Sequence, residues 1–239
     1  MTDKWSLLPG DDDPGYKWWP KNSNWQRGVA YTSMSYCKYF RGVIDVGAAY
    51  GAVSRIYAKN FAQVISVEMN QKLIPHLLAN TSEFDNILYY NMAMSDFIGS
   101  ANFSYYNKWS GLSTLKQTNP LATEPPSKIK TQVRKLDSFI TTDSLCDIYD
   151  SSNKISYIDL IKIDTEGSEL EVLKGGSKLI TEHKPAIVVE TTKETKEPVT
   201  NFLQNLGYVL KSTNHHDLFF RHGAKNYFSA TNKRFLKTI

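Results

Sequence analysis

The stretch LIKIDTEGSELEVLKG at residues 160–175 decides the fold of this chain. Its aliphatic start predicts the end of a buried parallel strand at 158–163, and acidic residues appear only where that strand should stop. A helix is expected at 167–174, ended by the Gly175-Gly176 pair. Ligands of open α/β sheets bind at the carboxyl ends of the strands. The junction therefore predicts a crevice with acidic walls.

Similar strand and helix patterns run along most of the chain. Apolar residues at helical spacing separate the first two expected strands, which makes a βαβ unit. The other expected elements are strands at 43–46, 64–67, 87–91, 101–106 and 186–190, helices at about 75–80, 138–149 and 197–206, and a terminal hairpin of 208–211 with 217–220. The pattern predicts an α/β, Rossmann-like domain with helices on both faces of the sheet.

Three regions are expected along the sequence. Residues 1–41 hold four of the five tryptophans around turn-forming residues, so we expect no long regular element there but an aromatic extension or lid. The regular domain should cover 42–221, with a basic insertion at about 107–132. A basic tail at 222–239 completes the chain.

Composition limits the possible classes of protein. The 239 residues suit one α/β domain, and a net charge of +4 is too small to name a partner. Cys37 and Cys146 show neither a disulfide framework nor metal-ligand spacing. Without a signal peptide or a spanning apolar run, we expect a cytoplasmic protein that does not insert into membranes. The basic insertion could attract nucleic acid, although a solvated loop is favoured.

A glycine turn follows the first expected strand. Gly47 and Gly51 allow a tight turn and close helix packing, but Ala48 and Ala49 fill the places between them, so this is not the Gly-x-Gly-x-x-Gly pattern of dinucleotide folds. Asp45 at this turn would repel a phosphate and suit a cation. Glu68 lies about 20 residues after Gly47, where an acid reaches ribose hydroxyls in such folds. A cationic adenosine without phosphates fits, and S-adenosylmethionine meets that description.

These residues resemble the FkbM-type S-adenosylmethionine-dependent methyltransferases of the class I superfamily. The matching segments are Val43–Gly47 with Gly51, Val67–Glu68, Ala93–Asp96, Lys135–Asp137, Lys162–Glu169, Pro185–Glu190 and Gly207–Tyr208. The resemblance implies a seven-stranded sheet in the order 3-2-1-4-5-7-6, in which the last-but-one strand is antiparallel. It also implies methyl transfer, usually to an oxygen of a sugar or another hydroxylated metabolite.

The glycine turn and the resemblance together predict the cofactor-binding residues. These are Asp45, Gly47, Ala48, Gly51, Glu68, Met69, Met92, Ala93 and Asp164. The family often has proline after its ribose-binding acid, whereas Met69 stands here, so the adenosine pocket should be lined differently. S-adenosylhomocysteine would be the product.

Asp164, Glu166 and Lys162 are the candidate catalytic residues. Asp164 is expected near the transferred methyl group as the base. If the strand stays extended, the three side chains point to one side of the sheet. For Lys162 the alternative is a structural ion pair with Asp164 or Glu190, and for Glu166 it is stabilisation of a helix start. No metal site is expected.

Candidate substrate residues are mostly aromatic. Trp18, Trp19, Tyr105 and Trp109 could form stacking walls for a sugar or a base, or simply cover the sheet edge. His215 and His216 in the expected hairpin turn are alternative bases, although turn histidines are more often merely exposed.

Three functions remain open. The first is an O-methyltransferase acting on a sugar, glycan or small hydroxylated metabolite. The second is an RNA ribose 2′-O-methyltransferase, suggested by the basic and aromatic residues. The third is a cofactor-binding scaffold without catalysis. A nicotinamide oxidoreductase is least favoured because the dinucleotide glycine pattern is missing. The sequence does not indicate an oligomeric state.

Overall fold

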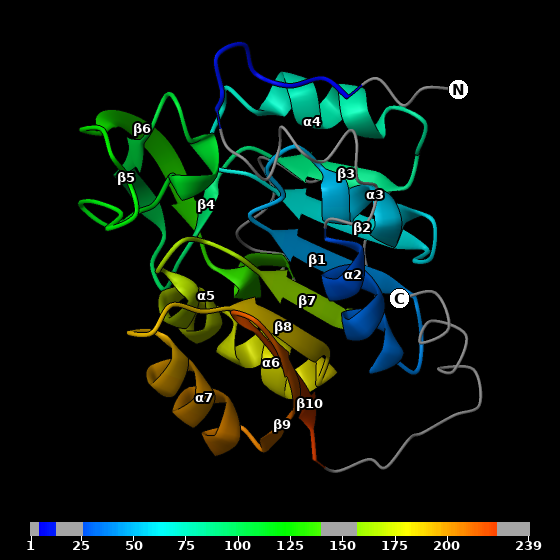
Figure 1. Ribbon diagram of the computed structural model, residues 1–239. Coiled ribbons are helices and arrows are strands. Elements are labelled where there is room, and N and C mark those ends of the chain that lie inside the picture. The colour runs from blue at the N-terminus through cyan, green and yellow to red at the C-terminus, as the bar shows by residue number, and fades with distance from the viewer. Residues whose placement is uncertain (1–4, 13–25, 140–156, 224–239) are drawn as a thin grey trace.

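The computed structural model describes residues 5–12, 26–139 and 157–223 (Figure 1). Its main feature is a sheet of seven strands in the order β3-β2-β1-β7-β8-β10-β9. The strands are β1 Gly42–Val46, β2 Gln63–Val67, β3 Ile87–Tyr90, β7 Leu160–Ile163, β8 Ala186–Glu190, β9 Tyr208–Asn214 and β10 Asp217–His222. β10 runs antiparallel to both of its neighbours. The expected α/β fold with a mostly parallel seven-stranded sheet is confirmed.

The strand labels count three further strands that lie outside this sheet. When only the strands of the large sheet are numbered along the chain, the observed order reads 3-2-1-4-5-7-6. The extra strands are β4 Ala93–Met94, β5 Gly99–Tyr105 and β6 Ser127–Arg134, and they form a second sheet in the order β4-β6-β5. In Figure 1 this small green sheet lies beyond one end of the large sheet.

Helices cover both faces of the large sheet because apolar side chains alternate along its central strands. Val43 packs against one helical layer, whereas Ile44 and Val46 pack against the other. The first layer contains α2 Arg27–Ser35 and α3 Ala52–Ala58, with α4 Ile74–Thr81 beside α3. The second contains α5 Glu169–Gly175, α6 Ser177–His183 and α7 Lys196–Asn205.

Helix α2 lies within residues 1–41, where the sequence predicted no long regular element, and it has nine residues. Ala30 and Met34 on α2 are fully buried and pack against α3 and the sheet. The turn-forming residues of the region lie before this helix, and the helix itself is short and mixed in polarity. Burial against the sheet, rather than its own periodicity, therefore stabilises α2.

Strand β6 corrects the interpretation of 107–132 as a poorly patterned insertion. Ile129, Thr131 and Val133 are on one face of the strand, and Thr131 and Val133 are buried. Polar Thr131 conceals the alternation in the sequence. The helix expected at 138–149 lies almost entirely outside the described residues. Its first two positions belong to a 3₁₀ turn at 136–139.

A close backbone contact joins the small sheet to α5. A Cβ atom on Gly175 would lie 2.0 Å from the carbonyl oxygen of Ser95, just after β4. Only glycine allows this approach. Within the described part of the chain, no helix has the length and apolar character needed to cross a bilayer.

Leu203 on α7 tests the packing of the second helical layer. The side chain is fully buried in the core, so Leu203→Ala should lower the free energy of unfolding by about 2–5 kcal/mol. Leu121→Ala is the matched control, because Leu121 is 66% exposed and its loss should cost less than about 0.5 kcal/mol. Urea unfolding followed by circular dichroism would measure both. Equal effects would contradict the described packing.

Candidate functional site

A cavity of about 260 Å³ opens where strands β1, β2, β7 and β8 end. It lies at the carboxyl edge of the parallel strands, as the sequence predicted. Six of the predicted cofactor-binding residues line it, namely Gly47, Glu68, Met69, Met92, Ala93 and Asp164. The opposite wall comes from the segment between the two longer strands of the small sheet, at residues 109–115.

Glu68 is held rigidly at the end of β2. One carboxylate oxygen accepts a hydrogen bond from the Ala49 amide at 2.9 Å, and the other accepts from the Asn70 amide at 2.8 Å. Burial raises the pKa of Glu68, while these two amides act in the opposite direction. Each oxygen keeps a second lone pair, so the fixed carboxylate can still accept hydrogen bonds from a ligand.

A buried ion network lies beneath this cavity. Asp45 and Lys162 are register partners on β1 and β7, and the Lys162 Nζ atom lies 3.3 Å from an oxygen of each of Asp45 and Asp164. The same ammonium donates to the carbonyl oxygen of Gly47 at 2.9 Å. The second Asp45 oxygen accepts from Ser54 at 2.6 Å. The predicted Lys162–Asp164 pairing is therefore present, and Asp45 joins it.

This network corrects the placement of Asp45, which was expected to face a cationic ligand. Asp45 is fully buried under α3 and does not line the cavity. Burial alone would lower the pKa of Lys162, but Asp45, Asp164 and Glu190 raise it above its ordinary value. Lys162 is thus a permanent cation that balances the acids around it, not a proton donor.

A glycine is required at position 47 by the packing of the protein itself, and not by the close approach of a ligand that the sequence predicted. Its φ is +78°, and a Cβ atom there would lie 1.8 Å from the carbonyl oxygen of Asp164. Gly51 faces the side chains of Leu77 and Thr81 on α4. Gly51 and Ala48, both predicted to bind cofactor, do not line the cavity. These glycines shape the turn by packing it against protein.

Gly47→Ala should lower the free energy of unfolding by more than about 4 kcal/mol or prevent folding, because backbone at Asp164 cannot yield easily. Gly10→Ala is the matched control, since Gly10 has φ +80° with open space around it. That control should cost only the strain of a left-handed residue, about 1–2 kcal/mol. Urea unfolding measures both. A similar cost for the two variants would refute the close contact.

Three carboxyl groups meet at the ends of β7, β8 and β10. Glu190 lines the cavity with Asp164, and Asp217 is its register partner on β10. The nearby Asp164 carboxylate and burial together raise the pKa of Glu190 to about 10. Burial, followed by Asp164, raises the pKa of Asp217 to about 7. Sequence reasoning considered Glu190 only as a partner of Lys162 and missed Asp217, which the antiparallel pairing brings here.

The raised pKa of Asp217 predicts a pH-dependent stability. Between about pH 4 and pH 7 the folded protein keeps a proton that the unfolded chain has lost, so stability falls as pH rises. Asp217→Asn should remove this loss and stabilise the protein by about 1–3 kcal/mol at pH 8, with little change at pH 4. Thermal unfolding across this pH range measures it. Asp85→Asn is the control, because Asp85 is exposed, and it should leave the dependence of stability on pH unchanged. If Asp217→Asn also left this dependence unchanged, the burial argument would be contradicted.

Comparison with known proteins identifies the family. A sequence model of the methyltransferase FkbM domain matches residues 45–210. The chain belongs to this family. Members of the FkbM family are methyltransferases that generally use S-adenosylmethionine. The matched region contains β2, β3, β7 and β8 of the large sheet and the acidic strand end at Asp164.

Comparison with solved structures returned methyltransferases at low sequence identity and with TM-scores below 0.5. An FkbM methyltransferase from Methylobacillus flagellatus KT shares 19% identity, with a TM-score of 0.49 over 75% of this chain and 43% of that one. This chain thus spans less than half of the Methylobacillus protein. A precorrin-6y C5,15-methyltransferase from Geobacter metallireducens GS-15 shares 13% identity, with a TM-score of 0.46 over 81% and 84% of the two chains. No curated protein matched the sequence.

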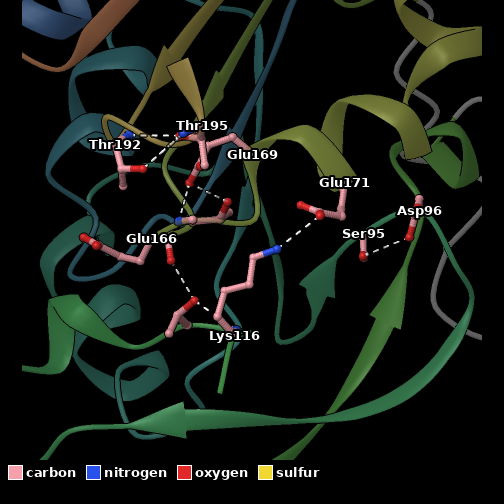
Figure 2. Close-up of polar contacts among 11 residues, drawn as sticks. Ser95, Asp96, Lys116, Glu166, Glu169, Glu171, Thr192 and Thr195 are labelled. Atoms are coloured by element: carbon pink, nitrogen blue, oxygen red, sulfur yellow. Dashed lines mark hydrogen bonds and ion pairs between the residues drawn. The ribbon is translucent and has the colours of Figure 1, made fainter. Parts of the chain in front are cut away.

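Glu166 and Glu169 have different surroundings after β7. Glu166 has φ +53°, lines the cavity, and accepts a hydrogen bond from the side-chain amide of Asn119 at 3.0 Å. Glu169 is buried and accepts from the Gly167 amide at 2.7 Å, which orders the start of α5. Figure 2 shows Lys116 reaching Glu171, on the opposite side from the Glu166 side chain. Glu166 therefore keeps a position at the cavity of the FkbM domain.

The predicted substrate residues separate into three groups. Trp109 lines the cavity. Tyr105 is buried in the small sheet, and the side chains of His215 and His216 are exposed at the hairpin turn without lining the cavity. Trp18 and Trp19 lie outside the described residues. The wall that follows Trp109 was missed, since Ser110–Ser113 is a short polar segment without a recognisable motif.

Proposed function

We propose that this FkbM domain transfers the methyl group of S-adenosylmethionine to a hydroxyl oxygen of a sugar, glycan or other small hydroxylated metabolite. The charge of the cavity carries this proposal. Among the described residues that line it, the ionisable side chains are Glu68, Asp164, Glu166 and Glu190, all of them acidic, and none is lysine, arginine or histidine. Such a lining favours a cationic cofactor and a neutral, hydrogen-bonding acceptor over a phosphorylated one.

The donor set fits the cofactor. The fixed carboxylate of Glu68 can accept the two ribose hydroxyls, and the apolar side chains of Met69, Leu73 and Met92 can hold the adenine ring. The acidic residues at the strand ends would attract a positively charged ligand. When bound, S-adenosylmethionine supplies an electrophilic methyl group on a positively charged sulfur.

Asp164 would take the acceptor's proton. Its carboxylate lines the cavity and is oriented from below by Lys162 at 3.3 Å. The Asp164 carboxylate, together with burial, raises the pKa of Glu190 beside it. Positioning of the hydroxyl in the narrow cavity supplies much of the rate enhancement, and removal of its proton adds to it.

Two other functions are outcomes of the same experiments. An RNA acceptor would bring phosphates to a cavity whose described charged lining is acidic, although basic residues such as Lys128 and Lys130 lie on nearby β6. A scaffold without catalysis would bind the cofactor and methylate nothing. Membership of the family supports methyl transfer but does not identify the acceptor.

Asp164→Asn tests the catalytic assignment. The amide keeps the shape of the side chain but is a poor base, so methyl transfer should fall about 10²- to 10⁴-fold. Binding of S-adenosylmethionine, measured by calorimetry, should stay within about tenfold of wild type. Transfer would be followed with radiolabelled S-adenosylmethionine and separate panels of free sugars, oligosaccharides and short capped RNAs.

Glu171→Gln is the control for this experiment. Glu171 lies on α5 close to Asp164 in sequence, pairs with Lys116 near the surface, and does not line the cavity, so its transfer activity should be unchanged. Full activity of Asp164→Asn would remove the role given to Asp164. Labelling of RNA alone would replace the sugar acceptor, and binding without any transfer would favour the scaffold.

A further inference from the structure

The N-terminal segment at residues 5–12 is anchored to the domain at several points. The Ser6 amide donates to Asn80 on α4, and the Ser6 hydroxyl bonds with His76 at 2.7 Å. Trp5, Leu7 and Leu8 pack against Tyr50 and Leu73. Residues 5–12, which we name the strap, are therefore ordered on the surface of the domain.

Asp11 of the strap joins two parts of the chain that are distant in sequence. Its carboxylate is buried at 8% exposure. One oxygen accepts from the Tyr50 hydroxyl at 2.6 Å and from the Ser110 hydroxyl at 2.5 Å. The Asp12 amide beside it donates to the Lys108 carbonyl at 2.6 Å. A buried carboxylate with these donors is a strong, directional anchor.

Of the two groups that Asp11 holds, Ser110 lines the cavity and Tyr50 directly follows Ala49, which lines it. Tyr50 follows Ala49, whose amide binds the Glu68 carboxylate at 2.9 Å. Ser110 lies in the wall formed by Trp109–Ser113, which lines the cavity on the other side. A continuous chain of contacts thus runs from Glu68 through the glycine turn and Asp11 to this wall.

The far end of the same wall is also tied down. The Thr114 hydroxyl donates to the Glu166 backbone carbonyl at 2.7 Å, and the side-chain amide of Asn119 donates to the Glu166 carboxylate at 3.0 Å. Asn119 also donates to the Leu112 carbonyl. The wall is therefore held at Ser110 from the strap and at Glu166 from the sheet.

We infer that Asp11 is a positioning residue that fixes the Trp109–Ser113 wall against the glycine turn, so that the N-terminal strap is part of the cofactor site. This inference rests on the proposed function. Since a ligand that contacts both walls binds best when they are fixed, its binding should in turn stabilise the strap. Asp11 does not line the cavity and acts through Tyr50 and Ser110.

Asp11→Asn in the full chain tests the inference, with S-adenosylhomocysteine as the probe. Loss of the charged acceptor should weaken binding roughly tenfold in calorimetry. Amide hydrogen exchange should become faster at 107–115 even without ligand, and bound S-adenosylhomocysteine should slow exchange at 5–12 in wild type. Asp85→Asn is the same substitution at an exposed site outside the cavity, and it should change none of these values.

Ser110→Ala provides a milder second variant that keeps the wall's backbone. If Asp11 acts through Ser110, the double variant should bind S-adenosylhomocysteine no more weakly than Asp11→Asn alone. Unchanged affinity and exchange in Asp11→Asn would overturn the inference, as would independent, additive effects of the two variants. Failure of wild type to bind the probe would overturn the proposed function instead, while the ligand-free exchange at 107–115 would still decide whether Asp11 holds the wall.

Discussion

The ammonium of Lys162, buried between Asp45 and Asp164, is the interaction on which the site depends. A lysine inside a parallel sheet is costly unless its charge is matched. Here one cation neutralises acids from two central strands and also holds the Gly47 carbonyl, so it fixes the two loops that form the base of the cavity. Replacing Lys162 would leave Asp45 and Asp164 without their shared counter-charge. The acidic strand end that faces the cavity is possible because its counter-charge is hidden below it.

The cavity combines two kinds of structure. Its base is the carboxyl edge of the large sheet, where positions are set by strand register and by backbone contacts such as that between Gly47 and Asp164. Its outer wall is a loop of the small sheet, held by side-chain hydrogen bonds to Asp11 and Glu166. The base is suited to a common cofactor chemistry. The wall is the part whose contacts can differ between relatives without disturbing the core.

The sequence predicted the features that arise from local pattern. Strands such as 186–190, the acid at Glu68 and the pairing of Lys162 with Asp164 follow from runs of apolar residues and from alternation along a strand. It failed where tertiary packing decides. Helix α2 has weak periodicity and is stabilised by packing against the sheet. Asp45 points into the core because it pairs with Lys162 on the neighbouring strand. Asp217 reaches the site only through the antiparallel pairing of β10. Contacts between distant segments, such as Asp11 with Ser110, leave no mark in a single sequence.

The contact between Gly175 and Ser95 is a fixed point of the small sheet, in contrast to the loop between β5 and β6. It brings the backbone of α5 against the backbone just after β4, so this point of contact requires a glycine at 175. The loop between β5 and β6 is fastened to the domain through Ser110, Thr114 and Asn119. Segments of different composition can be exchanged beyond these residues, provided that they and Gly175 are kept. For protein engineering, this makes residues 120–126, which do not line the cavity, a graft site that leaves its wall in place.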